Sequence, residues 1–199
     1  MKKSMLFIAT CLLALSLSAQ FSATMVYTMS GKTVNFKIFS DVNRYRYEFN
    51  ENGQEVAVIS QNETGDFYML MPQQKMAIKA KANSQMSMST DPLKQYEHFA
   101  GEGATEVIIG EESINGHPCV KKELRNIQKN EFGESNQHLF TVWYSEEFNF
   151  PLKMVNHIDG TSSSGMEVKD IKAWTPDEAS FSIPEGFTIM DQAMMMPER

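Results

Sequence analysis

The chain has 199 residues, with 18 lysines and arginines against 25 aspartates and glutamates, and a net charge of −7. Nucleic-acid binding normally requires a basic stripe that releases counterions from phosphates. The lysines here are scattered, which excludes a nucleic-acid partner, and the length fits one domain with a sizeable core.

The first nineteen residues have the three parts of a secretory signal. Lys2 and Lys3 precede the apolar run 5–15, and the stretch Ser-Leu-Ser-Ala follows at 16–19. We expect residues 1–19 to be a signal peptide and the mature protein to be exported to the periplasm, with secretion from the cell as an alternative. The apolar run, about eleven residues, is shorter than the roughly 20 that span a bilayer, so the chain is not expected to be membrane-spanning.

Cleavage after Ala19 changes both the charge and the cysteine count. It leaves 16 bases against 25 acids, a net charge of −9, and Cys119 as the single cysteine. An intramolecular disulfide is then impossible, so stability has to come from burial. Lipidation of Cys11 is the alternative, but Thr10 is larger than the residue usually found before a lipidated cysteine.

Alternating apolar and polar residues predict six strands in the first half of the chain. They cover residues 21–30, 34–38, 44–50, 55–60, 66–71 and 75–80. Asn52 and Gly53 are typical of a tight hairpin turn. Connections this short favour antiparallel neighbours, because parallel strands need longer crossovers.

Residues 81–104 break the alternation and contain a predicted helix. Asp91 can cap it, Pro92 suits its first position, and Gly101 ends it. The apolar residues Leu93, Tyr96, Phe99 and Ala100 then fall on one side of the helix.

Strands resume in the second half, at residues 105–113, 119–127, 137–144, 151–158 and 166–174. A polar loop is expected at 129–136, a helical turn at 175–178 and a last extended segment at 181–190. Residues 20–190 are therefore expected to form one domain, followed by a flexible C-terminal tail at 191–199. The strand 137–144 is apolar on both faces, which requires cover on each side.

Three stretches of the second half resemble a known family. They are INGHPCVKKE from Ile114, VWYSEEFNFPLKM from Val142 and FSIPEGFTIM from Phe181. Together they resemble a domain-of-unknown-function family of exported bacterial proteins related to the LolA/LppX-like lipoprotein-carrier and periplasmic lipid-binding proteins. The resemblance implies a mainly β fold with minor α: a curved antiparallel sheet forming an unclosed half β-barrel, with one or two short helices over its concave side and an apolar cavity between. In it, Ile183, Pro184 and Phe187 would close the sheet by packing.

The candidate ligand-binding residues follow from this arrangement. Methionine and aromatic side chains of the covering segment would face aromatic side chains of the sheet. Both kinds of side chain suit an irregular apolar pocket. Arg44 and Arg46 alternate with the aromatic residues of their strand and are interpreted as solvated edge charges. The expected cavity and lid residues are Met86, Met88, Leu93, Tyr96, Phe99, Tyr45, Tyr47 and Trp143.

The leading hypothesis is a periplasmic binding protein that holds a lipid acyl chain or an acylated protein in the concavity. No catalytic motif is present, so an enzyme is not expected, and neither a cofactor nor a metal site is expected. One alternative is a cell-envelope interaction or scaffold protein with a self-filled core, whose sheet edge binds a protein partner. A second is Cu(I) binding by methionine sulfur at Met86, Met88 and the tail.

Overall fold

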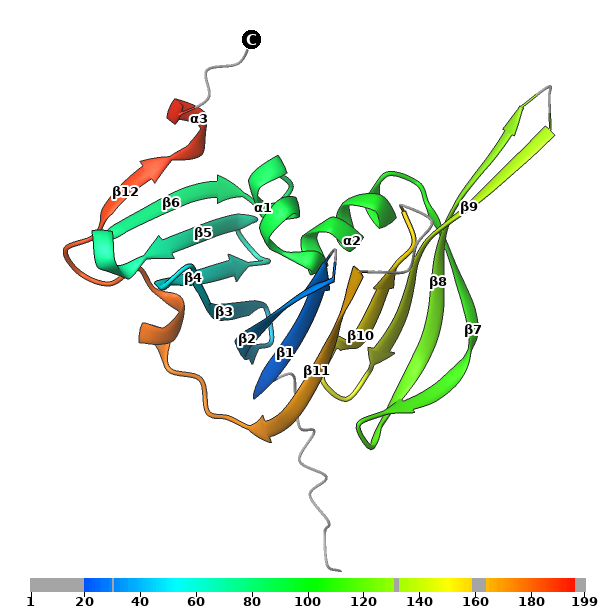
Figure 1. Cartoon of the computed structure of the whole chain (residues 1–199), viewed down its shortest axis with the longest axis horizontal. Coiled ribbons are helices and arrows are strands. Elements are labelled where there is room, and N and C mark those ends of the chain that lie inside the picture. The colour runs from blue at the N-terminus through cyan, green and yellow to red at the C-terminus, as the bar shows by residue number, and fades with distance from the viewer. Residues whose placement is uncertain (1–19, 30, 131–132, 159–163, 196–199) are drawn as a thin grey trace, which may run out of the picture.

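The computed structural model describes residues 20–29, 31–130, 133–158 and 164–195. Twelve strands form one sheet in the order β12-β6-β5-β4-β3-β2-β1-β11-β10-β9-β8-β7 (Figure 1). The sheet is curved and does not close into a barrel, which confirms the predicted mainly β, half-barrel fold. The expected signal peptide, 1–19, lies outside the described residues. The strands are β1 (Phe21–Met29), β2 (Lys32–Asp41), β3 (Arg44–Glu51), β4 (Gln54–Gln61), β5 (Asp66–Met71), β6 (Met76–Lys81), β7 (Thr105–Ile114), β8 (His117–Asn130), β9 (Gly133–Ser145), β10 (Phe150–Asn156), β11 (Ser164–Ala173) and β12 (Thr188–Asp191).

The order of the strands places β1 in the middle of the sheet, between β2 and β11. The chain builds one half outward from β1 to β6, crosses to the far edge, and builds the other half inward from β7 to β11. The crossing connection contains α1 (Gln85–Thr90) and α2 (Pro92–Gly101), at the mouth of the curved sheet (Figure 1). Among the described helices, none is long and apolar enough to cross a membrane.

The two helices begin at local capping residues. Asp91 accepts a hydrogen bond from the backbone N–H of Leu93 at 2.9 Å, and Pro92 occupies the first turn of α2, as predicted. The helix α1 was not expected from the sequence. The Ser84 hydroxyl accepts from the backbone N–H of Ser87 at 3.2 Å, which provides the N-cap that starts it.

The concave face holds the larger hydrophobic core, to which both halves of the sheet contribute. Leu93 of α2 is buried in it, and Met86, Tyr96 and Phe99 pack against it. The fully buried side chains at its centre include Met25, Ile38, Tyr47, Val58, Phe67 and Phe140.

The convex face is covered at one end by the C-terminal segment. After β11 the chain crosses the outside of the sheet, where Phe181 of the 3₁₀ turn η2 (Glu178–Phe181) packs with Ala57, Ile59 and Leu70. Residues of β4 are therefore buried on both faces, which explains its continuous run of buried residues. The chain then adds β12 to the sheet parallel to β6.

This C-terminal path differs from the sequence-based expectation. Ile183 and Phe187 pack on the convex cluster instead of closing the sheet, and the final strand begins only at Thr188. Arg44 is not a solvated charge, because it bonds Glu178 with N···O distances of 2.6 and 2.8 Å and its guanidinium lies 4.4 Å from the Phe181 ring centroid. Arg46 donates to the Ser180 carbonyl at 3.0 Å.

Two further segments differ from the prediction. The polar loop expected at 129–136 is mostly strand, because β8 and β9 continue pairing to Asn130 and Gly133. This hairpin projects beyond the body of the protein (Figure 1), so it needs no apolar alternation to form. Residues 191–195 of the expected tail are the end of β12 and the helix α3 (Gln192–Met195), and 196–199 lie outside the described residues.

Replacing Phe181 tests whether the C-terminal segment contributes to stability. The ring is 3% exposed, so Phe181→Ala should lower the free energy of unfolding by about 3 kcal/mol or more. Ile189→Ala, on the same segment but 56% exposed, should cost less than about 1 kcal/mol. Urea unfolding of both variants makes the comparison, and equal losses would contradict the packing described.

Candidate functional site

The helix α2 lies on the concave face through an apolar contact. The rings of Tyr96 and Phe99 meet the ring of Phe140 on β9, with centroid distances of 5.9 and 6.0 Å. Leu93, one turn earlier on the same side, is buried. These spacings of three residues put all three side chains on one helix face, as the sequence predicted.

A buried polar contact fixes the start of α2. The Tyr45 hydroxyl on β3 donates to Asp91 Oδ2 at 2.5 Å, and both residues are buried. Burial raises the pKa of Asp91 to about 6, against the opposing effects of the Tyr45 hydrogen bond and the Lys94 charge. Burial also raises the pKa of Tyr45, so its hydroxyl remains a donor.

Lys94 is unexpectedly buried beside this contact. Its ammonium donates to Glu97 at 2.7 Å and to Asn62 Oδ1 at 3.1 Å, and it lies 5.5 Å from the Tyr45 ring centroid. A buried ammonium needs such partners, because removing a charge from water is costly. The cluster therefore ties the first turn of α2 to the β4–β5 turn as well as to β3.

Polar contacts further along α2 reach the other half of the sheet. The Tyr96 hydroxyl donates to Glu106 on β7, which also pairs with Lys122 of β8 at 3.4 Å. Asn156 on β10 donates to Gln95 at 3.3 Å. These contacts are partly exposed, so each contributes little compared with the apolar contact.

A pocket of about 260 Å³ opens between α2 and the sheet. Its apolar wall combines Leu93 and Tyr96 of α2 with Tyr45, Tyr144 and Phe150 of three strands. Charged groups lie at its rim, and they are Asp41, Arg44 and Glu97. An apolar wall with few polar groups is typical of a ligand pocket, although this volume is below the usual range of about 300 to 1,000 Å³.

The structure brings some of the predicted site residues together. Tyr45, Leu93 and Tyr96 share the pocket, and Phe99 lies beside it on α2. Tyr47 is fully buried and does not line the pocket, and its hydroxyl has no hydrogen-bond partner among the described residues. Tyr144, Phe150 and Asp91 were not predicted as site residues, since only their position in the fold brings them to α2.

The remaining predicted residues lie apart from this pocket. Met86 and Met88 are half-buried on α1, and two positions along a helix separate side-chain directions by about 200°. This geometry gives no support to a thioether pair for Cu(I). Trp143 lies on the sheet face opposite Val142, with Lys121 and Lys153 at 4.8 and 4.9 Å from its ring and its indole N–H donating to Glu112.

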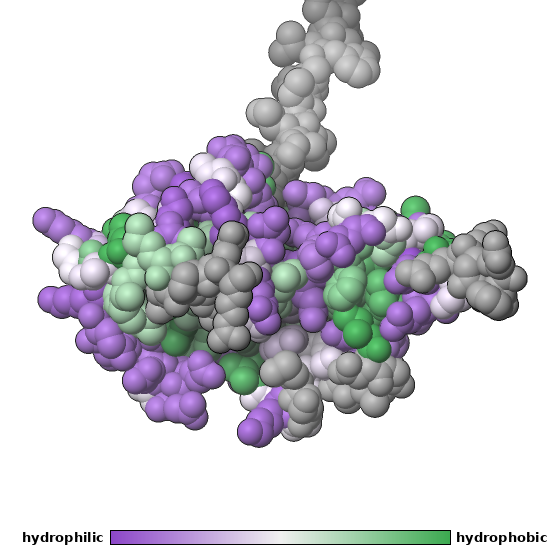
Figure 2. All heavy atoms as spheres, turned by 90° about the horizontal axis from the view of Figure 1, so that it is seen from above, coloured by the Kyte–Doolittle hydropathy of each residue, from purple (hydrophilic) through white to green (hydrophobic). Residues whose placement is uncertain are grey.

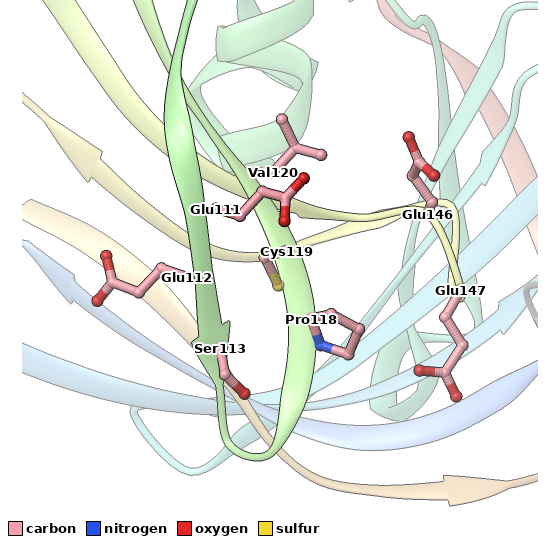
Figure 3. A pocket seen from close by; sticks show the side chains of 8 residues that line it. All are labelled: Glu111, Glu112, Ser113, Pro118, Cys119, Val120, Glu146 and Glu147. Atoms are coloured by element: carbon pink, nitrogen blue, oxygen red, sulfur yellow. The ribbon is translucent and has the colours of Figure 1, made fainter.

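A second pocket, of about 390 Å³, lies between the β7–β8 hairpin and the turn after β9. Figure 3 shows Glu111 on one side of it and Glu146 on the other, with Cys119 between. The part of the chain that the structure describes contains no group of three or more histidine, cysteine or acidic residues that could hold a metal ion. His138 and His157 do stack, at 4.0 Å between ring centroids.

Comparisons with known proteins relate this chain to others by fold alone. No family model and no curated protein matches the sequence. An uncharacterized conserved protein from Thermus thermophilus aligns with a TM-score of 0.57 and 12% identity, over 89% of this chain and 93% of that chain. It therefore shares the fold.

Two other solved structures align at lower scores. A chain of the Pseudomonas aeruginosa MucA/MucB complex has a TM-score of 0.49 and 15% identity, covering 82% of this chain and 55% of that one. A LolA superfamily protein from Nitrosomonas europaea has a TM-score of 0.38 and 13% identity, covering 82% and 90%. Membership of the family that the sequence resembles stays a prediction.

The buried Asp91 should make stability depend on pH. Its folded pKa lies above the ordinary 3.8, so its stabilising contribution is complete below about pH 4 and is lost as the pH rises through about 6. Two pKa units correspond to about 3 kcal/mol. Through Asp91, the wild type should therefore lose about 3 kcal/mol of unfolding free energy between about pH 4 and pH 7.5, and Asp91→Asn should remove this loss.

Urea unfolding at the two pH values measures this effect. Asp177→Asn is the matched control, because it replaces an exposed capping carboxylate at η2, away from α2. An Asp91→Asn variant with the full wild-type pH dependence would show that Asp91 does not titrate in this range.

Proposed function

We propose that this protein is a periplasmic binding protein that holds the acyl chain of a lipid or of a lipidated protein between α2 and the concave face of the sheet. The pocket lined by Tyr45, Leu93, Tyr96, Tyr144 and Phe150 is the observation that carries the proposal. No covalent chemistry is needed for such binding. The resemblance of the sequence to lipid-binding and lipoprotein-carrier proteins supports the same function.

Binding a whole acyl chain requires α2 to move. The pocket is small, and the concave core beneath it is filled by side chains of the protein. An acyl chain would replace the contacts of Leu93, Tyr96 and Phe99 with the sheet, exchanging one apolar contact for another. About ten methylenes at about 0.8 kcal/mol each supply roughly 8 kcal/mol before the costs of ordering and of moving the helix.

The charged rim of the pocket suits a ligand with a polar end. Arg44 faces this rim but is already paired with Asp41 and Glu178, so the rim carries no free cation among the described residues. A neutral or weakly charged head group therefore fits better than a strongly anionic one. The apolar end of the ligand would lie against Leu93 and Phe150.

The filled core favours a second candidate function. Tyr47, Phe67 and Phe140 have no exposed surface, as expected of a cell-envelope interaction protein whose core needs no ligand. Hydrogen exchange distinguishes the two candidates. In a lipid carrier, the amide hydrogens of α1 and α2 should exchange faster than those of β3, and adding a fatty acid should change their exchange rates. In a scaffold protein, adding a fatty acid should leave these rates unchanged.

The binding test uses the purified mature chain and a dansyl-labelled fatty acid. We expect saturable fluorescence enhancement, and co-purified acyl species in mass spectrometry of an organic extract. Tyr96→Ala and Tyr144→Ala each remove an aromatic wall from a half-buried position and should weaken probe binding about tenfold. Ile189→Ala, far along the sheet on β12, should bind as the wild type does.

Two results would overturn the proposal. One is a protein that is empty on extraction and does not bind the probe. The other is probe binding that both tyrosine variants leave unchanged, because the ligand would then lie elsewhere. Thermal unfolding of each variant separates lost binding from lost folding.

A further inference from the structure

The two edges of the open sheet are not protected equally. One edge is β12, a short strand of four residues that pairs with β6 over Thr188–Asp191, and short edge strands offer little to pair with. At the other end, β7 pairs with β8, and no further strand follows it in the order of the described residues. Along β7, every second residue therefore turns its backbone N–H and C=O away from the sheet.

The side chains of β7 leave this edge accessible. Nine of its ten residues are exposed, and three consecutive large apolar ones, Val107, Ile108 and Ile109, lie among them, with Ile108 69% exposed. Figure 2, seen from above, shows hydrophobic surface in both halves of the molecule between hydrophilic regions. Exposed edges are usually blocked by lysine, proline or a bulge. β7 contains no lysine or proline, and its bulge between Ile108 and Gly110 still leaves Thr105–Ile108 regularly paired.

The charge beside this edge is strongly acidic. Glu106, Glu111 and Glu112 lie on β7 itself, and Glu146 and Glu147 lie across the neighbouring pocket. Glu106 and Glu112 pair with lysines of β8, and Glu147 contacts His117. Neither Glu111 nor Glu146 has an ion pair among the described residues, and Figure 3 shows them on opposite sides of the pocket.

This charge decides which partner fits the edge. A second copy pairing antiparallel through β7 would set Glu106 opposite Glu111 or Glu112 of the other copy, and like charges directly opposite destabilise a sheet. A basic segment would instead place lysine or arginine side chains beside the glutamates of β7, of which Glu111 has no ion pair among the described residues. Its backbone would complete the ladder, and alternate apolar side chains would cover Val107 or Ile108.

We propose that β7 is a docking edge for an extended basic segment of a partner protein, which adds to the sheet as a further strand. The proposal does not depend on lipid binding, because β7 and the pocket under α2 are different surfaces. The edge does contact α2, because Glu106 of β7 accepts a hydrogen bond from Tyr96.

The test uses labelled peptides of about ten residues, the length of β7, in fluorescence anisotropy with the mature chain. One peptide alternates lysine with valine or threonine, a second replaces lysine by glutamate, and a third keeps the lysines but is N-methylated at alternate backbone nitrogens. We expect the lysine peptide to bind saturably and the other two at least about tenfold more weakly.

Variants of the protein identify the edge. Ile108→Lys and Glu111→Lys should each weaken binding of the lysine peptide at least about tenfold. Ile189→Lys places the same lysine on the opposite edge strand, at a residue that is also more than half exposed, and should bind the peptide as the wild type does. Circular dichroism and thermal unfolding verify that the variants fold.

Three outcomes would overturn the proposal. Equal binding of the N-methylated peptide would mean that charge alone attracts it, without strand addition. Absence of saturable binding would mean that the edge takes no basic segment. Dimerisation in analytical ultracentrifugation that Ile108→Lys abolishes would identify a second copy as the occupant.

Discussion

An open sheet of twelve strands leaves two faces and two edges that its own hydrogen bonds cannot cover. The connection from β6 to β7 joins the two halves of the sheet, and it passes over the concave side. The helices α1 and α2 lie in this connection, so the topology itself puts them over the core. The C-terminal segment covers part of the convex face and ends as the short edge strand β12, whereas the other edge strand, β7, is ten residues long.

Two kinds of contact attach α2 to the sheet. One is the burial of its apolar face, and the other is the hydrogen bond of Asp91 with Tyr45. Leu93, Tyr96 and Phe99 bury one face of the helix, which favours docking at any pH. Asp91 caps the helix and bonds Tyr45, but its burial disfavours the charged carboxylate. A helix held in this way can stay docked without a ligand and still be displaced by one that offers equivalent apolar surface.

Local patterns were sufficient to predict most elements and the antiparallel pairing of consecutive strands, but not the contacts between distant segments. Alternation identified the strands of the first half, and Asp91, Pro92 and Gly101 marked α2, because these signals arise from neighbouring residues. The outer part of the β8–β9 hairpin projects beyond the body of the protein, and residues 135–137 there are exposed, so no apolar alternation marks this part in the sequence. The parallel pairing of β12 and the cover of the convex face depend on residues more than a hundred positions apart, which no local pattern encodes.

In the candidate site, too, the sequence predicted the residues that local spacing determines. Leu93, Tyr96 and Phe99 follow from helix spacing, and Tyr45 follows from alternation on β3. On the strand 137–144, Phe140 and Val142 lie on one face, while Trp143, also buried, lies on the other face with lysines of the two adjacent strands at its ring. An apolar side chain on such a strand can be covered by the stems of charged neighbours, and its sequence position does not distinguish this from a ligand contact.

The contact between Tyr96 and Glu106 connects the two surfaces for which functions are proposed. Moving α2 to admit an acyl chain would release Glu106, which would retain only Lys122 as a partner. The charge of Glu106 would be unchanged, but the carboxylate oxygen bonded by Tyr96 would be open to a donor of a basic segment. By reciprocity of linked equilibria, a partner that neutralises Glu106 would favour the displaced helix by the same free energy. Ligand and partner binding would therefore be positively coupled through one exposed carboxylate, without a change in the strands between them.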